Sequence, residues 1–140
     1  MRLPPEVLER FVASYFSQRE RFLAAPSPAY LLDGQALRAR ALAFRRTFQE
    51  LRHPCSFYFA VKSNNTPRVA AILLEEGFGL DVSGAPELEG ALALGARDII
   101  FSGPGKTAEE LRLAAAHPEV TVLLDSFGEL ERLEGEALQL

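Results

Sequence analysis

Lys62 directly follows a run of apolar, mostly aromatic residues at positions 57–61, and this composition predicts a β-strand at 56–62. Successive side chains of a strand point to opposite faces, so Ala60 and Lys62 share one face. If both faces are covered, burial favours the neutral amine, which can attack a carbonyl carbon. Lys62 is therefore a candidate for covalent amine chemistry. The simpler interpretation is a solvated lysine at the end of a strand.

Other polar side chains also stand at the ends of predicted strands. In sequence order these residues are Lys62, Asp81, Ser83, Ser102, Asp125 and Ser126. The carboxyl ends of parallel strands meet at one rim, where Asp81 could pair with Lys62 or hold a ligand. The loop at 103–106 is expected to be a turn whose glycines could also approach a ligand, and its last residue, Lys106, is expected to be solvated.

Composition limits the classes of function. The chain has 140 residues, 48% of them hydrophobic, and a net charge of −4, which argues for one domain and against nucleic acid or an anionic membrane surface as partners. We expect no signal peptide and no membrane span, and hence a cytoplasmic protein. The single cysteine, Cys55, excludes an internal disulfide framework, and His53 and His117 each precede a proline, so no metal site is expected.

The elements that must position the rim follow a regular pattern. Predicted strands lie at 56–62, 78–82, 98–102 and 120–124, and each is followed by a predicted helix. Before them we expect an amphipathic helix at 4–24, a proline break, a short strand at 29–32 and a second helix that His53-Pro54 ends. At the far end, the chain could enter another strand near Leu140.

Helix starts carry their own signals. Asp33 can cap the second helix, and Thr66-Pro67 places proline at the first helical position of the third. Thr107 and Glu110 have the spacing of a capping box, and Ser126 and Glu129 repeat that spacing. The simplest interpretation of Thr107, and of Asp125 with Ser126, is therefore a helix cap.

Strands that alternate with helices predict a parallel sheet. Two architectures fit, an open doubly wound sheet and part of a (β/α)8 barrel. The turn at 63–65, after the first strand of the repeat, lacks the glycines that a doubly wound sheet usually carries there. A barrel needs eight units and four are predicted, so half a barrel or some other fold remains open. An incomplete barrel would leave two sheet edges open, and we expect such a chain to associate or aggregate.

The order of these features resembles the fold-type III pyridoxal-phosphate-dependent decarboxylases, which include ornithine, diaminopimelate and arginine decarboxylases. Tyr58-Phe59-Ala60-Val61-Lys62-Ser63-Asn64 is similar to the family's cofactor-lysine strand. Further similar segments are 28–33, 77–83, Glu87-Leu88, 99–101 with Lys106, and Leu124-Asp125-Ser126 with Glu129-Leu130. The resemblance implies an α/β fold: the N-terminal portion of an alanine-racemase-like (β/α)8 TIM barrel, with about four βα units. Residues 1–27 would form an N-terminal helical extension and 28–140 a partial barrel domain without the later half-barrel and β-domain.

The resemblance also implies a function. Lys62 would hold pyridoxal 5'-phosphate as a Schiff base, Asp81 would lie close to the cofactor and its lysine, and Ala60 would floor the pocket. The cofactor would act as electron sink while a small-molecule amino acid loses its carboxylate. That substrate would resemble diaminopimelate, ornithine or lysine, or be carrier-linked, and the full-length form would be a cytoplasmic homodimer. Because the family's phosphate-binding and pyridine-nitrogen partners come later in the chain, we expect the isolated chain to bind the cofactor poorly and to be inactive.

Two questions remain open from the sequence. Gly84 and Pro86 stand where the family usually carries serine and glycine, so the loop after Asp81 could differ in shape, and with it the choice of substrate. The alternative function is that of a non-catalytic homologue that acts as a binding or regulatory partner. Retention of Lys62 argues against it, and the run at 63–67 favours decarboxylases over alanine racemases.

Overall fold

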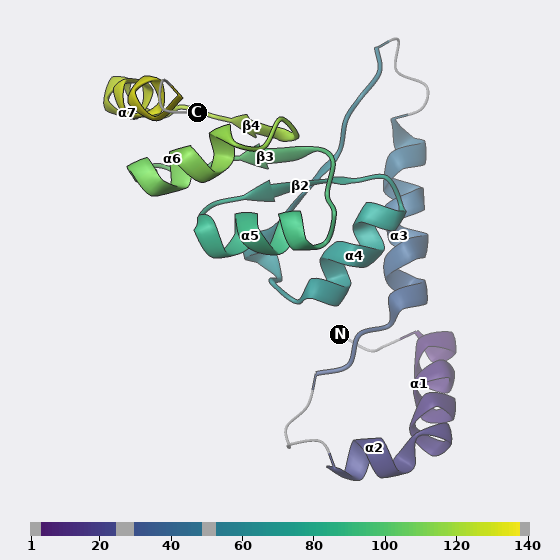
Figure 1. The fold of residues 1–140 in the computed structure, drawn as a ribbon. Helices are drawn as coiled ribbons and strands as arrows, with labels where there is room; N and C mark the ends of the chain where they lie inside the picture. The colour runs from purple at the N-terminus through teal and green to yellow at the C-terminus, as the bar shows by residue number, and fades with distance from the viewer. Residues whose placement is uncertain (1–3, 25–29, 49–52, 138–140) are drawn as a thin grey trace.

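The computed structural model describes residues 4–24, 30–48 and 53–137. Four strands alternate with helices, and Figure 1 shows α4, α5 and α6 together on one side of the sheet. The elements in order are α1 (Pro5–Ser17), α2 (Arg19–Ala24), α3 (Gly34–Thr47), β1 (Tyr58–Ala60), the 3-10 turn η1 (Val61–Ser63), α4 (Pro67–Glu75), β2 (Gly79–Val82), α5 (Ala85–Ala93), β3 (Ile99–Phe101), α6 (Ala108–Ala115), β4 (Val120–Val122) and α7 (Phe127–Ala137).

The strand order settles which of the two predicted architectures is present. All three neighbouring pairs are parallel and the order is β1-β2-β3-β4. Right-handed crossovers between consecutive neighbours place every helix on the same face, whereas a doubly wound sheet reverses its order and carries helices on both faces. The sheet is therefore the barrel type, with four of the eight strands that a complete barrel has.

The helix-covered face of the sheet holds the core. Leu80 and Val82 on β2 and Ile99 and Phe101 on β3 alternate along their strands, and all four are fully buried. They pack against apolar side chains of α4, α5 and α6, among them Leu88. Burial of aliphatic and aromatic side chains drives this packing. Because side chains alternate along a strand, every second residue of β2 and β3 lies on the helix-covered face.

The opposite face of the sheet is less covered, so the condition under which Lys62 would be desolvated is not met. Tyr58 lies across Gly79 on this face, and a Cβ at position 79 would lie 2.6 Å from the tyrosine ring. The Tyr58 hydroxyl donates a hydrogen bond to Asp98 (2.8 Å to Oδ1), and this contact raises the pKa of Tyr58. Tyr58 and Ala60 are only half-buried, so this face stays partly open.

Helix starts follow the predicted signals. Asp33 accepts a hydrogen bond from the Ala36 amide (2.9 Å), and Thr107 with Glu110 forms a complete capping box. Pro67 occupies the first position of α4. These contacts lie within single turns, which explains why local sequence was enough to predict them.

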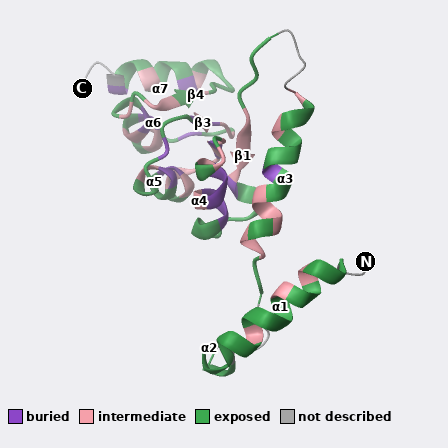
Figure 2. Ribbon diagram, turned by 90° about the vertical axis from the view of Figure 1, so that its right-hand side faces the viewer, coloured by how far each residue is buried: buried purple, intermediate pink, exposed green. Residues whose placement is uncertain are grey.

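The N-terminal part differs from its prediction. The expected helix at 4–24 is broken at Gln18 into α1 and α2, and α1 has no buried residue (Figure 2). Residues 30–32 form no strand and pair with none of the four strands of the described ranges, and Tyr30 is fully exposed. An ion pair between Arg10 and Asp33 (2.7 Å) links α1 to the start of α3.

Some predictions fall wholly or partly outside the described residues. These are the proline break with the first residue of the strand predicted at 29–32, the end of the second helix just before His53-Pro54, and the possible strand near Leu140. Helix α3 itself ends at Thr47. None of the described helices is long and apolar enough to span a membrane.

Candidate functional site

Lys62 lies just beyond the carboxyl end of β1, in the turn η1. The strand ends at Ala60 because the Ser63 hydroxyl donates a hydrogen bond to the Ala60 carbonyl (2.7 Å) and the Asn64 amide donates one to the Val61 carbonyl (3.0 Å). The Lys62 side chain is exposed. The prediction that the strand runs to Lys62 is therefore wrong, since β1 ends at Ala60. Of the two interpretations of Lys62, the structure agrees with the solvated lysine at a strand end.

Asp81 lies on β2 with Ala60 of β1 as its register partner, next to the turn that carries Lys62. The three residues that the sequence proposed for one site are thus brought together by the pairing of β1 with β2. Asp81 is half-buried, and its Oδ1 accepts a hydrogen bond from the Ser102 hydroxyl (2.5 Å). Sequence reasoning missed this contact, although Ser102 lies two residues beyond Ile100, the β3 partner of Asp81.

The loop after β3 approaches the end of β2 closely at Gly103. This glycine has a φ of 107°, and a Cβ there would lie 3.0 Å from the Ser83 carbonyl oxygen. The Ser83 hydroxyl is buried and has no hydrogen-bond partner within the described part of the chain. Glycine at position 103 therefore allows two loops of the rim to approach each other, because any side chain there would be strained and would clash with Ser83.

Two glutamates hold the loop between β2 and α5, around Gly84. The Ser83 amide donates a hydrogen bond to Glu87 (2.8 Å), and the Ala85 amide donates one to Glu110 of the next helix (3.0 Å). The hydrogen bond that the Thr107 amide donates to Glu110 lowers the pKa of this glutamate most, and the hydrogen bond from the Ala85 amide lowers it further. Each carboxylate thus satisfies backbone donors that would otherwise lack partners.

Lys106 is buried, with 2% of its surface exposed, and the expectation that it is solvated is wrong. Its Nζ donates hydrogen bonds to the carbonyl oxygens of Gly103 and Leu123 (2.5 Å each). Nζ also lies 3.3 Å from the Glu129 carboxylate and 3.4 Å from Asp125. The ammonium joins the loop after β3 to the end of β4, and the acceptors around it offset the cost of burying the charge.

Glu129 completes this cluster from the first turn of α7. Its carboxylate accepts hydrogen bonds from the amides of Gly105 (2.7 Å), Lys106 (2.9 Å) and Asp125 (2.9 Å). The Asp125 amide, and then the amide and ammonium of Lys106, lower the pKa of Glu129 to about 2. The Ser126 hydroxyl accepts from the Glu129 amide as predicted, but the carboxylate binds these other amides, so the predicted capping box is only half formed.

The chain has two lysines, Lys62 and Lys106, and their surroundings assign them different roles. The Lys106 amine is enclosed and donates hydrogen bonds to two carbonyl oxygens beside the Glu129 carboxylate. Lys62 is exposed, and it lies two residues after Ala60, the register partner of Asp81. Of the two lysines, Lys62 is therefore the one whose side chain is open to solvent.

Other candidate sites lie elsewhere or were not found. A hollow of about 880 Å³ lies between α1, residues 30–35 and α4, and neither Lys62 nor Asp81 lines it. No group of three or more His, Cys, Asp or Glu side chains in the described ranges could hold a metal ion. The rim at Lys62 and Asp81 thus lies apart from this hollow.

Comparison with known proteins gives this rim a context. Residues 35–139 match the family described as "Pyridoxal-dependent decarboxylase, pyridoxal binding domain". The chain is 34% identical to diaminopimelate decarboxylase of Bacillus methanolicus over 110 residues, covering 77% of this chain and 26% of that protein. It is also 34% identical to the L-glutamyl-[BtrI acyl-carrier protein] decarboxylase of Niallia circulans, over 77% of this chain and 25% of that protein.

A solved structure shows the same arrangement of elements. Diaminopimelate decarboxylase from Helicobacter pylori, in complex with L-lysine, superposes with a TM-score of 0.71 at 26% identity. The match covers 86% of this chain and 31% of that one. The chain thus spans about a quarter to a third of the length of these proteins.

Proposed function

Because the chain belongs to the pyridoxal-dependent decarboxylase family, through the family's pyridoxal-binding domain, we propose that Lys62 binds pyridoxal 5'-phosphate covalently for the decarboxylation of an amino acid. The observation that carries the proposal is the contrast between the two lysines of the chain. Lys62 is exposed at the carboxyl ends of the strands, whereas Lys106 is buried among acceptors. The rim therefore offers one amine, that of Lys62, to the aldehyde group of the cofactor.

The remaining rim residues have supporting roles in this proposal. Asp81 places a carboxylate beside the register partner Ala60, and the Ser102 hydroxyl holds one of its oxygens. Ala60 is small, so it leaves space for a planar ring on the open face of the sheet. When bound, the cofactor supplies the electron sink that allows an amino acid to lose its α-carboxylate.

The substrate and the assembly of the whole protein are part of the same proposal. The similar proteins named above act on diaminopimelate or on a carrier-linked glutamyl group, which supports an amino acid or a carrier-linked amino acid as substrate. We expect a cytoplasmic homodimer for the full-length form. Because this chain spans about a quarter of those proteins' length, we expect it to bind the cofactor weakly and to lack activity by itself.

A labelling experiment tests the role of Lys62. The chain is incubated with pyridoxal 5'-phosphate, reduced with borohydride and digested, and the modified peptide is identified by mass spectrometry. We expect label on Lys62, none on Lys106, and loss of the lysine label in Lys62→Ala. Label on Lys106, or label spread without preference, would contradict the proposal.

A matched variant separates a site from an ordinary exposed lysine. Arg97→Lys adds an exposed amine just before β3, at the end of the sheet opposite the rim. We expect Lys62 to be labelled at lower cofactor concentration than this added amine, and Asp81→Ala to reduce that preference. Equal labelling of both amines would instead support the alternative of a non-catalytic homologue.

A further inference from the structure

Ser102 follows the last residue of β3, and the residues on both sides of it are held by the end of β4. The Phe101 carbonyl accepts a hydrogen bond from the Leu123 amide (3.0 Å). The Gly103 carbonyl accepts one from the Lys106 ammonium (2.5 Å), which donates another to the Leu123 carbonyl (2.5 Å). The backbone around Ser102 is therefore tied to Leu123, directly on one side and through Lys106 on the other.

Ser102 itself forms two hydrogen bonds with β2. Its amide donates to the Val82 carbonyl (2.9 Å), and its hydroxyl donates to Oδ1 of Asp81 (2.5 Å). The first bond continues the parallel pairing of β2 with β3. The second depends on the exact place of the serine backbone, because a hydrogen bond weakens steeply as its angle bends. The contact with Asp81 thus depends on how the loop after β3 is held.

Asp81 connects this network to the turn that carries Lys62. Its register partner is Ala60, the last residue of β1, and β2 is in contact with the turn η1. A carboxylate turns easily about its terminal torsion, and a hydrogen bond to one oxygen restricts that rotation. Ser102 therefore limits the orientations in which Asp81 can meet an amine or a bound ligand.

The Lys106 ammonium is a fixed point of the network. The side chain is buried, with Nζ 5.5 Å from the centre of the Phe101 ring and 3.3 Å from Oε2 of Glu129. Glu129 also accepts hydrogen bonds from the amides of Gly105 and Lys106, at 2.7 and 2.9 Å. Charge-assisted contacts of this kind are strong in a site without water, so the amine has little freedom to move.

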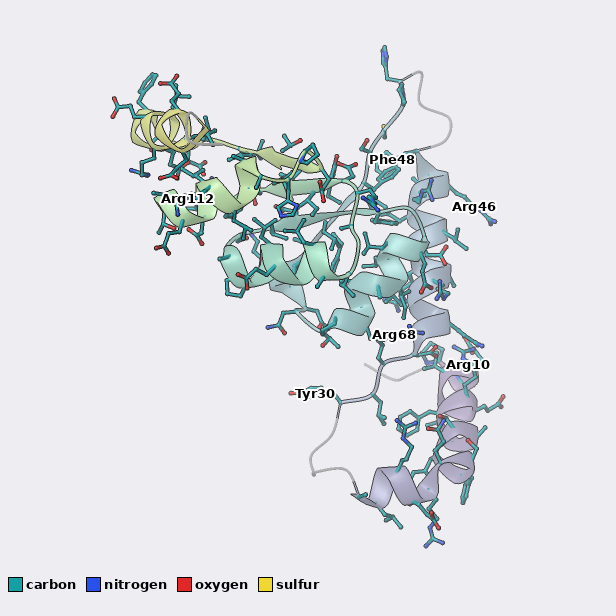
Figure 3. The ribbon with its side chains drawn as sticks, in the orientation of Figure 1. Arg10, Tyr30, Arg46, Phe48, Arg68 and Arg112 are labelled. Carbon is teal, nitrogen blue, oxygen red and sulfur yellow. The ribbon has the colours of Figure 1, made fainter. Side chains whose placement is uncertain are left out.

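Helix α7, which carries Glu129, is itself anchored. Arg112 lies on α6 (Figure 3), and its Nε is 2.5 Å from Oε2 of Glu136, near the end of α7. Arg132 of α7 donates a hydrogen bond to the Lys106 carbonyl (3.2 Å). The carboxylate partner of Lys106 therefore lies on a helix that is held near both of its ends.

We propose that Lys106 and Ser102 are positioning residues of the rim. The buried ammonium fixes the loop after β3, and this loop holds the Ser102 hydroxyl against the Asp81 carboxylate. Both residues act through Asp81 and not by contact with the cofactor. The inference rests on the proposed role of Lys62 and deepens it, since it names the residues that set the surroundings of that amine.

Reductive labelling with pyridoxal 5'-phosphate tests the role of Ser102, with the amine that Arg97→Lys adds as the internal reference. We expect Ser102→Ala to lower the preference for Lys62 about three- to tenfold, because the carboxylate loses its hydrogen bond. Ser102→Thr keeps a hydroxyl and should retain the preference within about twofold. An unchanged preference in Ser102→Ala would overturn the proposal, and so would an equal loss in both variants.

Lys106→Met should lower the same preference, because the Gly103 carbonyl then loses its ammonium donor. Ile72→Ala is the matched control for lost stability, since Ile72 is 2% exposed and lies on α4 against Gly34 of α3. Gly103→Ala displaces the same loop and decides the outcome if Lys106→Met does not fold, as checked by circular dichroism. A loss in Ile72→Ala as large as in Lys106→Met, or no loss in Gly103→Ala, would overturn the role of the loop.

The Asp81→Ala background separates positioning from a general effect on the fold. Once the carboxylate is removed, Ser102→Ala and Lys106→Met should each change the preference by less than about twofold. Equal losses with and without the carboxylate would overturn the proposal. If Asp81→Ala lowers the preference and the other two substitutions do not, the positioning roles alone are overturned. If Lys62 is not preferred even with Arg97→Lys alone, the proposed function is overturned, and this inference with it.

Discussion

Lys106 and Glu129 form a buried ion pair, with 3.3 Å between Nζ and Oε2, that joins the loop after β3 to the first turn of α7. Each of the two charged groups also has hydrogen-bond partners other than the opposite charge. The ammonium also binds two carbonyls, and the carboxylate also binds three amides. These hydrogen bonds offset the desolvation cost of burying two charges. Removing one partner leaves the other charge buried and unpaired, which lowers the stability of the fold.

Replacing Lys106 should therefore destabilise the chain far more than replacing Lys62. Lys106→Met leaves the Glu129 carboxylate without its ammonium, and we expect the free energy of unfolding to fall by about 3 kcal/mol. Lys62→Met, at an exposed position, should change it by less than about 0.5 kcal/mol. Urea denaturation followed by circular dichroism measures both, and similar losses for the two variants would contradict the assignment.

Acid should weaken the fold through Glu129. Its pKa is lowered from 4.5 to about 2 by the amide of Asp125 and by Lys106. A lowered pKa in the folded state contributes stability that is complete above about pH 4.5 and is lost as the pH falls towards 2. Urea midpoints between pH 6 and pH 2 should therefore converge for the wild type and Glu129→Gln, and a constant difference across that range would refute the role.

Two glycines should respond to alanine with opposite signs. Gly103→Ala forces a side chain into a φ of 107° and against Ser83, which should cost at least about 1 kcal/mol. Gly90 lies inside α5, where an added methyl group would meet only open space, so Gly90→Ala should stabilise by about 0.5–1 kcal/mol. Thermal unfolding of both variants measures this, and a neutral Gly103→Ala would show that the two loops do not need their close approach.

The contact between Ser102 and Asp81 should appear as a coupling energy. Ser102→Ala, Asp81→Asn and the double variant form a cycle in which we expect about 1 kcal/mol of coupling, because the hydroxyl donates directly to the carboxylate. Ser126 caps α7 and shares no contact with Asp81, so the matched cycle with Ser126→Ala should give no coupling. Equal coupling in both cycles would indicate a general effect on the fold.

The sequence was sufficient to predict features that depend on a few neighbouring residues. Thr107 and Glu110 form the capping box that their spacing indicates, and Asp33 caps α3. The strand predicted at 78–82 forms as β2 at 79–82. Repetition of strand and helix limited the architecture to two choices, and strand order then selected the barrel type.

The extent of the elements was harder to predict. The strand expected at 56–62 ends at Ala60, because Ser63 and Asn64 form turn hydrogen bonds that compete with strand pairing. The short strand expected at 29–32 does not form at 30–32, where no neighbouring strand pairs with it. A β-strand requires a partner, and apolar composition alone does not supply one.

The roles of the two lysines were decided by tertiary structure alone. The sequence left Lys62 open to both interpretations, a buried amine or a solvated one, and predicted that Lys106 is solvated. In the structure Lys62 is exposed and Lys106 is buried. Burial of Lys106 depends on the Leu123 carbonyl and on Glu129, which lie 17 and 23 residues further along the chain. Sequence by itself determined which residues stand at the rim, because strand and helix periods are local; only the packing of distant loops decided which amine is enclosed and which is free to react.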